Sequence, residues 1–106
     1  MKSMNSVKSF PLKKDHVFED NDTNETVFKN VIENEWHHLL HGINMSIFTF
    51  GQTSSGKTYT MKGVPSDEGL VPLSLTRMFN KLDTKKDCMY KLNMSYFEIY
   101  NEQIND

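Results

Sequence analysis

A stretch near the middle of the chain carries residues whose types and spacing suit phosphate binding. Eight consecutive residues fit the pattern G-x-x-x-x-G-K-[ST] at every defined position. They are Gly51, Gln52, Thr53, Ser54, Ser55, Gly56, Lys57 and Thr58. Glycines permit backbone angles that aim N–H groups at phosphate oxygens, and a helix that follows the loop adds the positive end of its dipole. The pattern therefore predicts a phosphate-binding loop, and a Gly/Ser-rich turn that matches by chance is the weaker interpretation.

Two side chains of this loop have separate expected roles. Lys57 would reach the β and γ phosphates of a nucleotide, and the Thr58 hydroxyl would bind Mg²⁺, whose other ligands would be phosphate oxygens and water. We therefore expect a nucleotide and Mg²⁺ as ligands. We predict no catalytic residue within the chain, because Glu98, Asn101 and Glu102 have no nucleophile beside them and fit the polar end of a strand.

The remaining polar clusters have simple structural interpretations. The histidines His37, His38 and His41 suit the last turn of a helix, where the dipole favours them, and no nearby third ligand supports a metal site. Trp36 is expected in the core. The charges of residues 67–68 are interpreted as solvated loop charges.

The elements that must position the loop can be predicted from periodicity. A capping box of Asp22 and Glu25 predicts a helix over residues 24–41, which Gly42 would end. Its apolar residues recur at helical spacing: Phe28, Val31, Ile32, Trp36 and Leu39. The β-prone residues 46–50 predict a strand buried on both faces of a parallel sheet.

Beyond the phosphate loop, residues 57–62 can open a helix, and the glycines and proline of residues 63–69 predict a loop. A helix can restart at Val71-Pro72. Its expected apolar face is Leu75, Met78, Phe79 and Leu82. Alternation of period two over residues 90–96 predicts a half-buried strand, and the shifted phase at Phe97 and Ile99 leaves a bulge or two covered faces as alternatives.

Composition limits the class of protein. The chain has 106 residues, 37% apolar and 25% charged, with a net charge of −2, which is typical of one small soluble domain. This balance favours neither nucleic acid nor an anionic membrane as a partner. No apolar run approaches the roughly 18 residues of a membrane span. The single cysteine, Cys88, points to a reducing compartment, so we expect a protein of the cytoplasm or the nucleus, with the cytoplasmic location preferred.

The sequences "SIFTFGQTSSGKTYTMKG", "GLVP" and "SYFEIYNEQIND" resemble, at these separations, the front half of the kinesin motor domain. The resemblance covers residues 15–106, includes a strand at "DHVF" and leaves residues 1–14 as an unassigned polar arm. It implies an α/β fold, part of a P-loop NTPase with a mixed sheet between flanking helices. It also implies Mg-ATP hydrolysis on microtubules and a place on the cytoskeleton. Tyr59 and "EIYNE" look most like centromere-associated kinesins, which implies a spindle or kinetochore location and places Tyr59 beside the base.

The chain also departs from the family pattern. Residues 1–14 contain no R-x-R-P motif, Ile43 stands where the family has an aromatic residue, and Leu73 stands where it has arginine. The two switch motifs, N-x-x-S-S-R-S-H and D-x-x-G, do not occur in the 106 residues, and no helix cap or closing turn is evident before Asp106. We therefore expect a part of a motor domain without ATPase activity of its own, which binds Mg-ATP weakly or not at all. One alternative is a truncated nucleotide-binding or protein-interaction module. A weaker alternative is a small phosphoryl-transfer enzyme of another phosphate-loop family, and the sequences "EIYNE" and "GLVP" argue against it.

Overall fold

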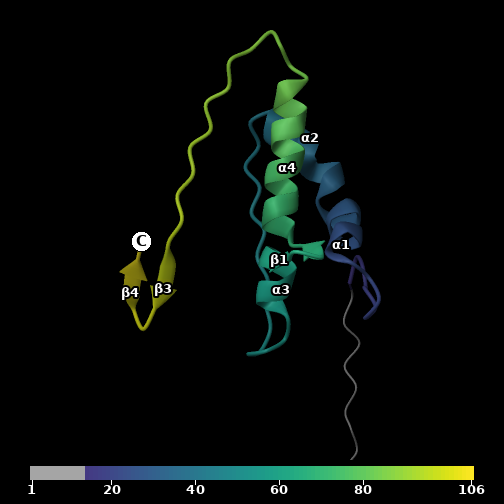
Figure 1. Ribbon diagram of the computed structural model, residues 1–106, viewed down its shortest axis with the longest axis vertical. Coiled ribbons are helices and arrows are strands. Elements are labelled where there is room, and N and C mark those ends of the chain that lie inside the picture. Colours follow the sequence, from purple (N-terminus) through teal and green to yellow (C-terminus); the bar gives the residue numbers. More distant parts are fainter. Residues whose placement is uncertain (1–13) are drawn as a thin grey trace, which may run out of the picture. The chain divides into compact units, whose positions relative to one another are not determined.

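The computed structural model describes residues 14–106, so all but the last residue of the expected arm lies outside the described part of the chain. The elements run in the order α1 (Asn24–Val31), the 3-10 turn η1 (Glu33–Glu35), α2 (Trp36–Leu40), α3 (Lys57–Lys62), β1 (Gly63–Val64), β2 (Asp67–Glu68), α4 (Leu70–Asp83), β3 (Glu98–Tyr100) and β4 (Gln103–Asn105) (Figure 1). The chain divides into two compact units at Ser74, within α4. The phosphate loop belongs to the first unit.

Helix α1 begins where it was predicted, but a different residue caps it. The N-cap is Thr23, in extended conformation, and its hydroxyl accepts a hydrogen bond from the Thr26 N–H at 3.2 Å. Asp22 does not cap the helix, because its carboxylate accepts the Glu19 N–H at 2.7 Å in the preceding turn. The predicted capping box is therefore wrong by one residue.

The predicted helix over residues 24–41 is confirmed with one interruption, since Ile32 and η1 separate α1 from α2. Its inner face holds three of the four buried apolar side chains of the described core, Phe28, Ile32 and Trp36, spaced four residues apart; the fourth is Leu70. The expected end at Gly42 is also confirmed. Gly42 has φ +82°, and the N–H groups of Gly42 and Ile43 donate to the carbonyls of Leu39 and His38, a Schellman motif.

The segment that follows the phosphate loop returns on itself tightly. Helix α3 is present as predicted, and the loop over residues 63–69 is an antiparallel hairpin in which Gly63 pairs with Glu68 and Val64 with Asp67. A Cβ atom at Gly63 or Gly69 would lie closer than 3.0 Å to neighbouring backbone atoms. Gly69 also donates its N–H to the Lys62 carbonyl at 3.1 Å. Helix α4 then starts with Pro72 in its first turn, as predicted.

Three predicted strands are absent. Residues 15–18, 46–50 and 90–96 form no strand, and the expected buried strand exposes Phe48 at 83% and Phe50 at 98%. A strand needs a neighbouring strand to pair its backbone groups, and the described residues supply none for these three segments. The described strands form two separate antiparallel hairpins and no mixed sheet.

The last described element is a hairpin that sequence patterning missed. Strands β3 and β4 pair antiparallel, with Ile99 opposite Ile104. Asn101 and Glu102 form the turn, with φ of +50° and +60°. Positive φ at both central residues is typical of a type I′ turn, which matches the twist of a hairpin. The polar residues at 101–102 therefore make a closing turn, contrary to the expectation that none precedes Asp106.

Candidate functional site

The predicted phosphate loop forms an exposed turn that leads directly into α3. Two of its residues adopt left-handed conformations, Ser54 with φ +61° and Gly56 with φ +87°. The Ser55 N–H donates to the Gln52 carbonyl at 3.3 Å. Gly56 is the N-cap of α3 and makes no side-chain capping bond, and its carbonyl accepts the Thr60 N–H at 2.9 Å. The loop therefore ends at the residue where the helix begins, the arrangement that phosphate loops use.

The Lys57 side chain forms hydrogen bonds with the backbone of its own loop. Its ammonium donates to the Gly51 carbonyl at 2.7 Å and to the Gln52 carbonyl at 2.5 Å. A Cβ atom at Gly51 would lie closer than 3.0 Å to the Ser55 hydroxyl oxygen, so the Ser55 side chain would have to rotate to make room for it. The ammonium therefore lies beside the first two residues of the loop, a position that we call the mouth of the loop. A bound phosphate group could take the place of these two carbonyls as the partner of the ammonium.

A cavity of about 270 Å³ lies beside this helix, and Lys57 and Thr58 both line it. Its lining is Thr49, Lys57, Thr58, Met61 and Lys62. Sequence reasoning missed Met61 and Lys62, although helical periodicity places them four residues after Lys57 and Thr58 on the same side of α3. Lys62 thus adds a second positive charge to the cavity wall that contains Thr58.

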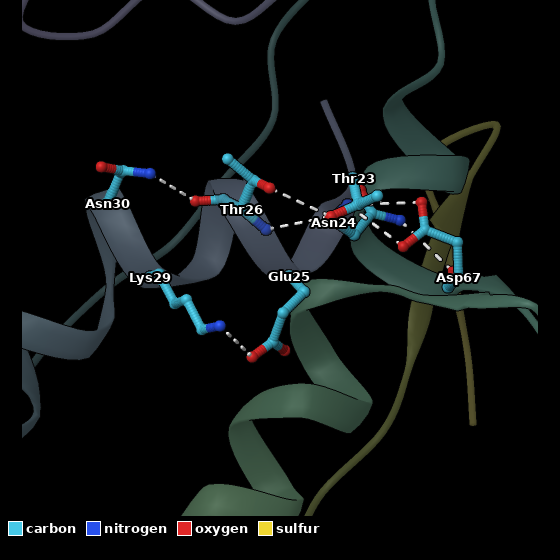
Figure 2. A network of polar contacts seen from close by, with 7 residues as sticks. All are labelled: Thr23, Asn24, Glu25, Thr26, Lys29, Asn30 and Asp67. Atoms are coloured by element: carbon cyan, nitrogen blue, oxygen red, sulfur yellow. Dashed lines mark hydrogen bonds and ion pairs between the residues drawn. The ribbon is translucent and has the colours of Figure 1, made fainter. Parts of the chain in front are cut away.

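Asp67 was interpreted as a solvated loop charge, and that interpretation is wrong. Its carboxylate accepts the backbone N–H of Asn24 at 3.1 and 3.3 Å (Figure 2). It also accepts the hydroxyl of Tyr59 at 2.6 Å. The Asn24 side chain, buried to 4% exposure, donates to the backbone carbonyls of Tyr59 at 3.2 Å and Asp67 at 3.4 Å. The network joins α1, α3 and the hairpin, and no local sequence pattern signals a bond between residues 43 apart.

The same contact changes the acidity of Tyr59. The hydrogen bond to Asp67, followed by partial loss of hydration and the negative charge of the carboxylate, raises the pKa of Tyr59 above its ordinary value of 10.0. The folded chain therefore keeps the phenol proton at a pH where the unfolded chain releases it. The stability from this contact is complete below about pH 10 and is lost as pH rises through the folded pKa.

We expect Asp67→Asn to lower the pKa of Tyr59 toward 10.0, because both the charged acceptor and its electrostatic effect are removed. The pKa is measured by NMR titration of ¹³C-labelled tyrosine, with Tyr59→Phe used to assign the signal. Glu68→Gln, in the same strand, is the control and should leave the titration unchanged. An identical Tyr59 titration in Asp67→Asn would show that the contact does not exist in solution.

Each histidine contacts a group three or four residues before it in the chain. Nδ1 of His37 lies 2.6 Å from the Asn34 carbonyl and Nδ1 of His41 lies 2.6 Å from the His37 carbonyl, so each Nδ1 carries a proton. Nε2 of His38 is 3.4 Å from the Glu35 carboxylate. Within residues 14–106, no group of three His, Cys, Asp or Glu side chains is placed to hold a metal ion.

In the same part of the chain, every helix is too short or too polar to cross a membrane.

Comparison with known proteins identifies the family. Residues 2–106 match the kinesin motor domain. The chain is 40% identical over 92 residues to kinesin-like protein KIN-7N of Arabidopsis thaliana, and 41% identical over 96 residues to the kinesin heavy chain of Caenorhabditis elegans. It is 39% identical over 92 residues to centromere-associated protein E of Homo sapiens. Each match covers 87% of this chain but only 11%, 12% and 3% of the respective relative.

Proposed function

Because the chain belongs to the kinesin motor-domain family, with its α/β fold of the P-loop NTPase type, we propose that residues 51–58 bind the phosphates of Mg-ATP in a microtubule motor. The observation that carries the proposal is the position of the Lys57 ammonium on the Gly51 and Gln52 carbonyls, at the mouth of a loop that leads into α3. ATP binding would draw this ammonium from the carbonyls to the β and γ phosphates.

The magnesium ion would be held beside the same helix. The Thr58 hydroxyl is a hard oxygen ligand of the type that Mg²⁺ prefers, and Thr58 lines the 270 Å³ cavity together with Lys57. The bound ion would neutralise charge on the phosphates. Tyr59, the next residue, is proposed to lie beside the base, with its hydroxyl on Asp67 limiting how far its ring can turn.

The remaining properties of the motor are proposals for the whole protein. Movement along microtubules, mixed-sheet packing of the strand-like residues 46–50, and a cytoskeletal location at the spindle or kinetochore follow from the family and its centromere-associated relative. A second candidate is a truncated nucleotide-binding or protein-interaction module. The exposed aromatic side chains Phe48 and Phe50 favour this candidate, because large apolar side chains on a surface often contact partners.

We expect the isolated 106 residues to show no microtubule-stimulated ATP turnover. Hydrolysis needs a positioned water and charge stabilisation at the γ phosphate, and the two switch motifs that supply them in the family do not occur in this sequence. The measurement is phosphate release with and without microtubules. Turnover that disappears in Lys57→Ala would contradict this expectation.

The experiment that tests the proposed function uses a chimeric motor. In it, the chain replaces the segment that it matches in the motor domain of the C. elegans kinesin heavy chain. We expect the chimera to bind Mg-ATP and to hydrolyse it faster in the presence of microtubules. A chimera that folds, as judged by circular dichroism, and binds microtubules without binding Mg-ATP would contradict the proposal and favour the interaction module.

A further inference from the structure

We propose that Asp67 is a positioning residue for the phosphate loop: from the neighbouring hairpin, its carboxylate sets the orientation of the helix that carries Lys57 and Thr58. This inference rests on the proposed function only in naming the ligand of the loop. The contacts that support it lie entirely within the first unit of the fold.

The direct contact is with the residue after Thr58. The Tyr59 hydroxyl donates to Oδ2 of Asp67 at 2.6 Å, a short bond to a charged acceptor. Lys57, Thr58 and Tyr59 are consecutive in the first turn of α3. A bond that fixes the Tyr59 side chain therefore limits rotation of the same helical turn, which also carries the Lys57 ammonium and the Thr58 hydroxyl.

Asp67 can act in this way because it is itself anchored. Both of its carboxylate oxygens accept the N–H of Asn24, the first residue of α1 (Figure 2). The buried amide of Asn24 then reaches the Tyr59 carbonyl at 3.2 Å, which gives α3 a second attachment on its backbone. Tyr59 is therefore held by two hydrogen bonds, one from its hydroxyl to Asp67 and one from the Asn24 amide to its carbonyl. Together they define the orientation of α3 better than either bond alone.

Helix α3 needs such support. It has only six residues and no side-chain cap at its start, and a helix this short is not stable by itself. The hairpin is close to it because Gly63 and Gly69 let the two ends of the loop approach without side chains, with Gly69 bonded to the Lys62 carbonyl. Asp67 therefore lies on a short hairpin whose two ends, Gly63 and Gly69, meet beside the last residue of α3.

The test measures amide hydrogen exchange in the full 106-residue chain without nucleotide. The reporter is the Thr60 N–H, which is bonded to Gly56 in α3, and the reference is the Ile32 N–H, which is bonded to Phe28 in the core. We expect Tyr59→Phe and Asp67→Asn each to speed exchange at Thr60 about tenfold, because each removes a hydrogen bond to a charged group. The double variant should show no more than the larger single effect, since both changes break one contact.

The second readout is the affinity for Mg-ATP, measured by chemical-shift titration, which should weaken about tenfold in both single variants. Glu68→Gln is the matched control and should change neither readout. Unchanged Thr60 exchange, equal acceleration at Ile32, or unchanged Mg-ATP affinity despite faster Thr60 exchange would each overturn the positioning role. If Asp67→Asn does not fold, the isosteric Tyr59→Phe decides the question. If the wild-type chain shows no shift at the loop, the chimeric motor tests the proposed function, and Thr60 exchange still reports whether Asp67 orients α3.

Discussion

Lys57→Ala should lower the microtubule-stimulated ATP turnover of the chimeric motor by a factor of about 10²–10³, the loss typical of removing one preorganised group that stabilises developing charge. The ammonium lies at the mouth of the loop, bonded to the Gly51 and Gln52 carbonyls. Alanine removes both this internal bond and the positive charge that would meet the β and γ phosphates. The measurement is phosphate release at saturating microtubules over a range of Mg-ATP concentrations.

Lys81→Ala is the matched control, because Lys81 is an exposed lysine in the last turn of α4. It removes the same charge from the chain and should leave turnover within about twofold, as expected for a surface substitution away from the site. Equal turnover in Lys57→Ala and the unchanged chimera would contradict the role assigned to Lys57.

Gly63→Ala should destabilise the first unit by about 3 kcal/mol, through backbone strain and steric overlap together. Gly63 has φ +73° and ψ −164°, a region that is essentially restricted to glycine. Its new Cβ would also overlap the backbone of Asp67 and Gly69. The free energy of unfolding is measured in urea by fluorescence of Trp36, the single tryptophan, which is buried in this unit.

Gly42→Ala separates the two causes. Gly42 also has positive φ, +82°, but a Cβ there would have no atom within 4 Å. It should therefore cost only the backbone term, about 1 kcal/mol. If both variants lose the same stability, the close approach at the base of the hairpin does not contribute.

The helices could be predicted because their signals are local. Phe28, Ile32 and Trp36 repeat at helical spacing, and Gly42 supplies the left-handed residue that a helix end needs. The capping residue was missed because Asp22 and Thr23 both suit an N-cap. The structure gives the position to Thr23 and uses Asp22 in the preceding turn.

The strands could not be predicted from local pattern because a strand depends on its neighbours. Residues 46–50 and 90–96 have suitable residue types, but within the described chain neither finds a partner for its backbone groups. The hairpin of β3 and β4 was missed for the opposite reason. Its turn uses Asn101-Glu102, and glutamate is an unusual residue at a position with positive φ.

The loop of the candidate site can be proposed from a local sequence pattern, whereas the contacts that support the loop cannot. The pattern of residues 51–58 identifies Lys57 and Thr58, and both line the cavity beside α3. Asp67 and Asn24 escaped detection because a polar residue in a loop and another at a helix start are common in exposed positions. Only the fold shows that they meet at Tyr59.

The central claim, that residues 51–58 bind nucleotide phosphate, is tested most directly by amide chemical shifts in the ¹⁵N-labelled chain during titration with Mg-ATP. Chemical shifts report weak binding, and weak affinity is what we expect from a loop with so few neighbouring elements. The account predicts saturable shifts concentrated at Gly51–Thr58 that disappear in Lys57→Ala and persist in Lys81→Ala. Shifts that cluster instead around the cavity of Glu35, His38 and Ile43, or that survive Lys57→Ala, would contradict it.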